Sequence, residues 1–267
     1  MGPNFIYLRG YSGYSLPGGA ILTKDLVKWA KANAMPGIAV TDSGNLFGSL
    51  EFALAAANEG IQPIMGAVLY IESCDKSENR SATPPKPDQL LVYAKDEAGW
   101  KNLLALVSKS YLAPASGVTP ILSMADLEAH NEGLIILTGG IYGAIGKALL
   151  YNRDVKAEEL LNQFKASFSG RLYIELMRHG LQAEVAIEER LIELAYKHNL
   201  PLVATNDAFF IKESMFEAHD AFLCIAEGTY VGEDKRRRLT PEHRLKTAQE
   251  MQELFADIPE ALANTVA

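Results

Sequence analysis

Residues 37–48 read GIAVTDSGNLFG, and this stretch decides the fold class. Its first part, Gly37–Thr41, is a short apolar run with several β-branched residues, which is typical of a buried strand. A polar turn follows, and a helical pattern begins at Asn45. A buried strand that leads through a short turn into a helix is the repeating unit of α/β folds with a mainly parallel sheet.

The same unit recurs along the chain. Short apolar runs bounded by turn residues give the strand candidates Phe5–Leu8, Gly37–Thr41, Pro63–Ile71, Gln89–Ala94, Gly133–Leu137, Leu172–Glu175 and Pro201–Thr205. The helix candidates between them are Thr23–Asn33, Asn45–Glu59, Asp96–Ser110, Ala157–Phe168 and Ala183–His198. We expect Thr23 and Asp96 to be N-caps. Seven strands of this kind predict a barrel or a doubly wound sheet.

Composition limits what the chain can do. Its 267 residues fit one α/β domain, so we expect a single domain over residues 1–267. The net charge of -8 disfavours tight DNA binding by the chain alone. Two cysteines, Cys74 and Cys224, are too few for a disulfide framework. With no signal peptide and no apolar run long enough to span a bilayer, we expect a cytoplasmic chain without membrane association.

Two segments fall outside the strand–helix pattern. Ser73–Asp88 is polar, contains three prolines and shows no periodicity, so we interpret it as a mobile surface loop. From about residue 240 we expect C-terminal helices, with a helix, a turn and a helix over 247–267 and Pro259 near a helix start. The chain stops at Ala267 without a C-cap signal, which we expect of a piece cut from a longer chain.

Polar stretches follow the first two predicted strands, where parallel α/β folds bind ligands. Residues 8–20 read LRGYSGYSLPGGA, and residues 41–48 read TDSGNLFG. Further motifs follow in order: GIQPIMG (60–66), GWKNL (99–103), GLIILTGG (133–140), PLVATND (201–207), EAHDA (217–221) and LFADIPEA (254–261). Over essentially the whole chain, this series resembles the PHP (polymerase and histidinol phosphatase) domain at the front of bacterial DNA polymerase III alpha subunits. The resemblance implies a distorted seven-stranded (β/α) barrel.

In that family, the resemblance implies, histidines and carboxylates hold several metal ions that activate a water for attack on a phosphate. This chain departs from those ligands. Its residues at the ligand positions are Arg9 and Tyr11 for paired histidines, Gly18 for an aspartate, Ser43 for a histidine, Val68 for a glutamate, and Gln89 and Phe209 for histidines. None of these is a comparable ligand. We therefore expect a degenerate metal site, no catalytic residues and no cofactor within these residues.

Two carboxylates of the family pattern remain, Asp42 and Asp207. We expect them to serve as helix caps or loop hydrogen-bond acceptors. The alternative is a single magnesium ion held with waters, since two carboxylates cannot build a multinuclear cage. We also consider that the guanidinium of Arg9 replaces the lost metal charge by neutralising Asp42 or Asp207.

Other polar residues are weaker candidates. Residues 175–180 read ELMRHG, so Glu175, Arg178 and His179 could supply an acid, an anion clamp and a base. We expect His179 to be a structural hydrogen-bonding residue instead. We expect His219 to be a satisfied, partly buried histidine on a helical face. The basic run 235–238 would contact phosphates, or else lie in a solvated loop or an intrachain contact.

The function that we expect is that of a structural and docking module. The resemblance implies that the intact chain is a DNA-directed DNA polymerase, which uses magnesium in a palm domain absent here and contacts DNA through its other parts. It also implies attachment of a separate 3′–5′ exonuclease subunit. One alternative is a residual metal-dependent phosphoesterase, an exonuclease or pyrophosphatase. An unrelated barrel enzyme would require every motif match to be accidental.

Overall fold

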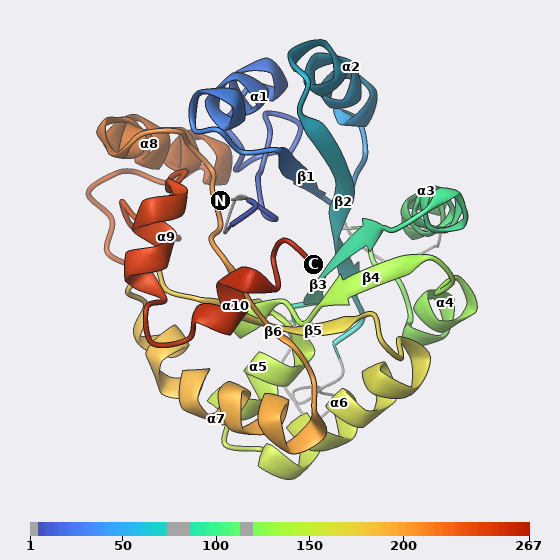
Figure 1. Cartoon of the computed structure of the whole chain (residues 1–267). Coiled ribbons are helices and arrows are strands. Elements are labelled where there is room, and N and C mark those ends of the chain that lie inside the picture. The colour runs from blue at the N-terminus through green and yellow to red at the C-terminus, as the bar shows by residue number, and fades with distance from the viewer. Residues whose placement is uncertain (1–4, 74–85, 113–119) are drawn as a thin grey trace.

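The structure is a computed structural model that describes residues 5–73, 86–112 and 120–267 (Figure 1). Within these ranges, six strands form one sheet in chain order: β1 (Gly37–Ser43), β2 (Gln62–Ile71), β3 (Asp88–Ala94), β4 (Leu134–Leu137), β5 (Leu172–Met177) and β6 (Leu202–Thr205). β3 runs antiparallel to both of its neighbours, and the other adjacent pairs are parallel. The predicted α/β class with a mainly parallel sheet is confirmed.

The seventh predicted strand, Phe5–Leu8, is wrong as a regular strand. This segment and the residues that continue it to Tyr11 make isolated bridges instead of a ladder, from Tyr7 to Ile38 and from Gly10 to Ala208. The amides of β1 donate to its carbonyls, whereas its own Tyr11 amide donates 3.0 Å to the Ala208 carbonyl. Because the segment changes partner within a few residues, no regular ladder forms. It nevertheless joins β1 to the residues after β6 and so closes the curled sheet.

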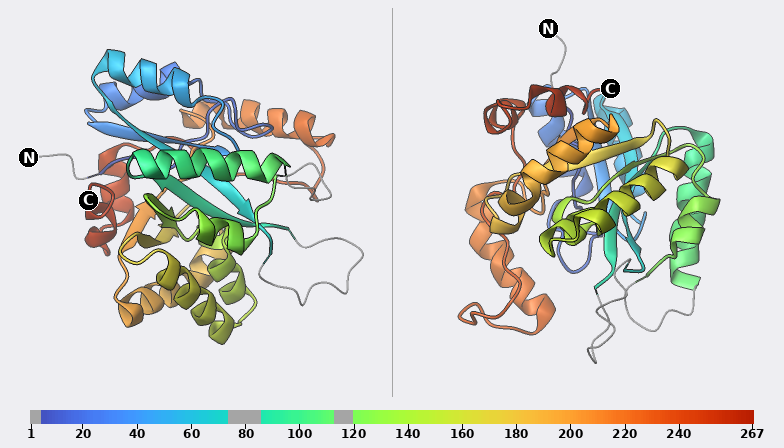
Figure 2. Two further views of the ribbon diagram at one scale, coloured as in Figure 1. Left: turned by 90° about the vertical axis from the view of Figure 1, so that its right-hand side faces the viewer. Right: turned by 90° about the horizontal axis from the view of Figure 1, so that it is seen from below.

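Helices surround the strands, as Figures 1 and 2 show. Those that match predictions are α1 (Thr23–Ala32), α2 (Ser49–Glu59), α3 (Glu97–Leu112), α6 (Asp154–Ser167), α7 (Gln182–His198), α9 (Ala248–Leu254) and α10 (Pro259–Ala263). Those without a predicted range are α4 (Met124–Ala129), α5 (Ala144–Leu150), α8 (Phe216–Glu227) and the 3-10 turns η2 (Gly140–Tyr142) and η3 (Glu213–Met215). None of the helices in the described ranges is long and apolar enough to cross a membrane.

The two predicted N-caps have different outcomes. Asp96 is confirmed, because its carboxylate accepts a hydrogen bond from the Gly99 amide, at 2.9 Å, at the start of α3. Thr23 is wrong: the N-cap of α1 is Leu22, and the Thr23 hydroxyl donates to Glu51 instead. The predicted loop 73–88 falls largely on residues 74–85, which lie outside the described residues, and its last residue already belongs to β3.

Two apolar clusters stabilise the fold. The larger one packs the helices against the outside of the sheet. We call the second the inner cluster; its buried members are Tyr11, Ala39, Val68, Leu91, Tyr93, Leu137, Val203, Phe209, Phe210, Leu223 and Leu239. Several of these residues were predicted from the resemblance to stand at metal-ligand positions. The inner cluster therefore lies where a ligand site was expected.

Candidate functional site

Arg9 is the central residue of the site and is 0% exposed. Its Nη1 donates to both carboxylate oxygens of Glu175, at 3.0 and 2.9 Å. Its Nε forms an ion pair with Asp207 Oδ1. The phenol oxygen of Tyr11 accepts from Nε and Nη2, at 3.2 and 3.0 Å. One guanidinium thus joins side chains that lie up to 198 residues apart in sequence, as the numbers of Arg9 and Asp207 show.

The electrostatics keep Arg9 charged. Burial lowers the pKa of Arg9, but the carboxylates of Asp207 and Glu175 raise it further, so that the pKa lies well above its usual range. Burial also raises the pKa of the Tyr11 phenol well above its usual range, although Arg9 opposes this. Glu175 accepts a further hydrogen bond from Thr205 Oγ1 at 2.6 Å. The arrangement is a buried cation held by two carboxylates and a neutral phenol.

Aromatic side chains fill the space beside Arg9. The rings of Tyr11 and Phe209 stack with centroids 4.3 Å apart and an interplanar angle of 6°. A Cβ on Gly18 would lie 3.4 Å from the Phe209 ring, and the Arg237 guanidinium carbon lies 5.6 Å from that ring's centroid. Val68 is buried in the same inner cluster. The structure therefore brings Tyr11, Val68 and Phe209 together, with Gly18 at their edge.

Asp42 has a separate environment. Its carboxylate accepts hydrogen bonds from Ser12 N at 2.8 Å, Ser12 Oγ at 2.7 Å and Ser15 Oγ at 2.5 Å. Burial raises the pKa of Asp42, and the hydrogen bonds from Ser15 and Ser12 offset part of that increase. Loop hydrogen bonding, not helix capping, describes this residue, because α2 begins only at Ser49. Of the two carboxylates considered for Arg9, the ion pair is with Asp207.

Ser43 and Gln89 lie outside the inner cluster. The Ser43 amide donates to Ser15 Oγ at 3.1 Å, and its carbonyl accepts from Asn45 Nδ2 at 3.0 Å. Gln89 lies on β3 opposite Tyr70. The backbone of Gln89 packs closely against Gly139. A Cβ atom added at position 139 would lie 2.2 Å from the carbonyl oxygen of Gln89. Ser43 is therefore held by hydrogen bonds within its loop, and the backbone of Gln89 packs against Gly139.

The residues of the ELMRHG stretch diverge in space. Glu175 joins Arg9, whereas Arg178 pairs with Glu188 and Asp257 on the outside, each at 2.7 Å. His179 is buried; its Nδ1 contacts Glu184 Oε1 at 2.7 Å, and its Nε2 accepts from the Asp207 amide at 3.0 Å. These partners place the ring proton on Nδ1. Both ring nitrogens of His179 thus make hydrogen bonds within the chain, as the sequence analysis expected of a structural histidine.

Sequence reasoning missed His243 and Glu184. The His243 ring stacks on that of His179 with centroids 4.1 Å apart. Burial, and then the neighbouring His179, lower the pKa of His243 to about 2. Glu184 had a usable signal, since it stands at the third position of α7, where acidic residues bond back to the chain. His243 had none, because 64 residues separate it from His179.

His219 and the basic run 235–238 also make intrachain contacts. His219 Nε2 donates to the Gly18 carbonyl at 2.6 Å, but its Nδ1 is buried without a partner among the described residues. The prediction of a satisfied, partly buried histidine therefore holds for Nε2 and not for Nδ1. Burial lowers the pKa of His219. Arg236 makes a two-bond ion pair with Asp220, both bonds at 2.6 Å, so the intrachain alternative is correct for this residue.

Metal ligands do not gather anywhere in the described ranges 5–73, 86–112 and 120–267. No group of three or more histidine, cysteine, aspartate or glutamate side chains there is placed to hold a metal ion. The carboxylates of Glu175, on β5, and Asp207, just after β6, both form ion pairs with the guanidinium of Arg9. The interactions that these side chains make are ion pairs and hydrogen bonds.

Comparisons with known proteins identify the family. The model of the PHP domain matches residues 8–179. The chain is 41% identical over 266 residues to the DNA polymerase III subunit alpha of Caulobacter vibrioides, covering 99% of the chain and 23% of the relative. It is 42% identical over 266 residues to that of Rickettsia bellii, covering 100% of the chain and 22% of the relative. The chain thus spans less than a quarter of these relatives' length.

Among solved structures, an amidohydrolase from Chromobacterium violaceum matches with a TM-score of 0.51 and 16% identity, over 76% of this chain and 87% of that one. This likeness concerns the fold. The family model covers well over half of the chain. The matches to the two polymerase subunits cover 99% and 100% of the chain. The chain therefore belongs to the PHP domain family, and within that family it resembles the DNA polymerase III alpha subunits.

Proposed function

We propose that this chain is the PHP module of a replicative DNA polymerase alpha chain, and that it is a scaffold and docking surface without a metal centre of its own. The observation that carries the proposal is the position of Arg9, buried between Glu175 and Asp207. In this proposal, the rest of the alpha chain carries out DNA synthesis with magnesium and makes the main contacts with DNA, in the cytoplasm.

The residues present do not fit the several metal ions of the family. A divalent cation between Glu175 and Asp207 would meet the permanent charge of Arg9, which repels it. The stacked rings of Tyr11 and Phe209 take up the neighbouring volume and offer no ligand. Asp42 already accepts three hydrogen bonds from two serines. These contacts support a site in which internal pairing and apolar packing replace metal binding.

Metal content and hydrolysis test this part of the proposal. The chain, purified without chelator, is analysed for metals and then assayed on a generic phosphodiester and on pyrophosphate with added manganese, magnesium or zinc. We expect no stoichiometric metal and no hydrolysis above that of the Arg9→Met variant. Two or three bound ions with metal-dependent cleavage would instead establish the residual phosphoesterase, with Asp42, Asp207, Glu175 and His179 as its candidate residues.

Docking is tested separately. We propose that a 3′–5′ exonuclease subunit attaches to this module, because a polymerase chain whose PHP site lacks metal ligands needs its proofreading activity from another subunit. The chain is mixed with the purified exonuclease subunit, and the mass of any complex is measured by size-exclusion chromatography with light scattering. We expect a one-to-one complex. Two separate peaks at concentrations of about 10 μM would remove the docking role and leave the scaffold.

A further inference from the structure

A groove runs along the outer side of α7. A hollow of about 510 Å³ opens between α7, the residues that follow β5, and α9 (Figure 1). We call it the α7 groove, after Val185, Glu189, Ile192 and Glu193 of α7, which face Leu254 of α9 across it. Every residue that lines it lies within the described ranges.

The groove offers an apolar surface that the fold does not need for its own packing. α7 is anchored by its opposite face, where Ile187 and Leu191 are buried in the core. In the groove, Val185 is 76% exposed, and Ile192 and Leu254 are only partly buried. Since apolar side chains gain free energy when they leave water, this surface favours contact with another apolar surface.

The charges of the groove are unbalanced. Among the described residues, its lining carries four carboxylates and one cation, Arg178. Glu184 is buried and hydrogen-bonded, and Glu188 pairs with Arg178 at 2.7 Å. No ion pair or side-chain hydrogen bond joins Glu189 or Glu193 to another residue in the described part of the chain. The groove therefore presents two exposed carboxylates beside its apolar surface.

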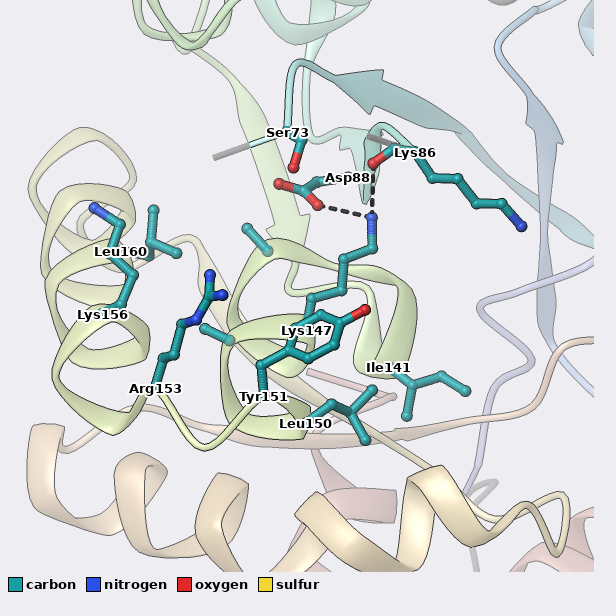
Figure 3. Close-up of a pocket in the computed structure, with 12 residues that line it drawn as sticks. Ser73, Lys86, Asp88, Ile141, Lys147, Leu150, Tyr151, Arg153, Lys156 and Leu160 are labelled. Carbon is teal, nitrogen blue, oxygen red and sulfur yellow. Dashed lines mark hydrogen bonds and ion pairs between the residues drawn. The ribbon is translucent and has the colours of Figure 1, made fainter. Parts of the chain in front are cut away.

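A carboxylate in another pocket shows the contrast. Lys147 Nζ contacts Asp88 Oδ1 at 2.8 Å, so that carboxylate is neutralised from within the chain (Figure 3). Glu189 and Glu193 stand four residues apart on α7, where like charges repel each other. Cations from outside, placed against these two side chains, would relieve the repulsion and supply the complementary charge.

We propose that the α7 groove docks an amphipathic helix of a separate protein. Two lysine or arginine side chains of that helix, one turn apart, pair with Glu189 and Glu193, and its apolar side chains cover Val185, Ile192 and Leu254. Long cationic side chains suit this surface, because their aliphatic stems lie on apolar groups while their charged ends reach the carboxylates. Nucleic acid and anionic lipid do not fit, since the two carboxylates repel phosphates.

Fluorescence anisotropy tests the proposal with three labelled peptides of about 18 residues, or five helical turns. The first carries lysines four residues apart on the same face as leucines. The second has glutamates in place of these lysines, and the third has the composition of the first in scrambled order. We expect only the first peptide to bind, and to bind more weakly in about 0.3 M salt than in about 0.05 M salt.

Two variants separate the charged part of the groove from the apolar part. Glu189→Gln combined with Glu193→Gln is expected to weaken binding of the first peptide at least about fivefold in the lower salt, and less in the higher salt, because exposed ion pairs are screened. Val185→Ser is expected to weaken binding at least about threefold in both salts, since it removes apolar contact alone. Circular dichroism verifies that the variants are folded.

The matched control is Glu132→Gln combined with Glu217→Gln, which removes two exposed charges outside the groove. It is expected to bind the first peptide as the unmodified chain does. Equal binding of the first and scrambled peptides, or equal weakening by the control and the groove variant, would overturn the proposal. Loss of binding in the intact alpha chain would also overturn it, by showing that another part of that chain fills the groove. The outcome does not depend on Arg9 or on the exonuclease subunit.

Discussion

Arg9 is the buried cation of the site and forms ion pairs with Glu175 and Asp207. A buried guanidinium that pairs with two carboxylates cannot be removed without leaving those carboxylates uncompensated. The loss is larger than that of an exposed ion pair, because water cannot solvate the remaining charges. This difference in burial makes the residue suitable for a stability measurement.

We expect Arg9→Met to lower the free energy of unfolding by about 3–5 kcal/mol. Arg9→Lys keeps the charge but loses the planar fork, so its loss is expected to be smaller. Both are measured by urea unfolding monitored by circular dichroism. The control is Lys31→Met, whose partner Glu59 lies with it on the surface, and we expect its unfolding midpoint to stay unchanged. Equal midpoints for Arg9→Met and Lys31→Met would contradict the assigned role.

His243 predicts the pH dependence of stability. Burial keeps this histidine neutral in the folded chain by lowering its pKa to about 2, whereas the unfolded chain has the ordinary value of 6.5. Below pH 6.5 the unfolded chain therefore binds a proton that the folded chain does not. The stability that depends on neutral His243 is fully present above pH 6.5. As the pH drops from there toward 2, the free energy of unfolding falls by up to about 1.4 kcal/mol per pH unit.

His243→Gln removes this proton uptake. We expect its free energy of unfolding to fall less steeply between pH 6 and pH 5 than that of the unmodified chain, measured by urea unfolding at each pH. Above pH 7 the two chains should differ by a constant offset, which reports the lost stacking on His179. Parallel curves across the whole range would show that His243 is not the group responsible.

At the scale of elements, the sequence predicted most strands and several helices, whereas it predicted few of the side-chain contacts. Leu202–Thr205 was recognisable because a short, wholly buried apolar run has few other structures available to it. Phe5–Leu8 has a similar pattern, but Tyr7 bridges to β1 and Gly10, just beyond the segment, bridges to Ala208, and this change of partner depends on how the sheet closes. The short helices α4 and α5 lacked the length that makes helical periodicity visible.

The cap of α3 gives a prediction at this scale. Asp96→Ala removes the carboxylate that accepts from the Gly99 amide, so we expect a loss of about 1 kcal/mol in the free energy of unfolding. Glu97→Ala serves as the comparison, because its side chain makes only an exposed pair with Lys101 among its described ion pairs. Thermal unfolding should separate the two variants. If they shift the midpoint equally, the side-chain cap contributes nothing.

For the whole molecule, closure of the curled sheet determines which residues meet. The sequence alone led us to expect departures from the family's ligands, because that expectation rests on residue types. The stacking of Tyr11 on Phe209 and the choice of Glu175 as a partner for Arg9 were not expected, because the pairs come from opposite ends of the chain. Neither periodicity nor spacing specifies contacts between such distant segments.

Removing the hydroxyl oxygen of Tyr7 is expected to weaken the closure of the curled sheet. The Tyr7 hydroxyl accepts from Asn206 Nδ2 at 2.9 Å and donates to the Arg244 carbonyl at 3.2 Å. We expect Tyr7→Phe to cost about 1–2 kcal/mol and to speed hydrogen exchange of the β1 amides that bond to this segment. Tyr196→Phe, which removes an exposed hydroxyl bonded to Glu260, should leave exchange unchanged. Equal exchange in both variants would exclude a sealing role for Tyr7.

The hydrogen bond from the Tyr7 hydroxyl to the Arg244 carbonyl joins residues separated by 237 positions. A ribosome that adds about 5–20 residues per second needs roughly 10–50 s to make that intervening stretch. During this time the segment 7–10 can already pair with β1, but Ala208 and Arg244, which contact that segment from its other side, have not been made, and unpaired strand edges promote association between nascent chains. The chain therefore depends on its last quarter for protection of its first, and we expect chaperones to engage it during translation.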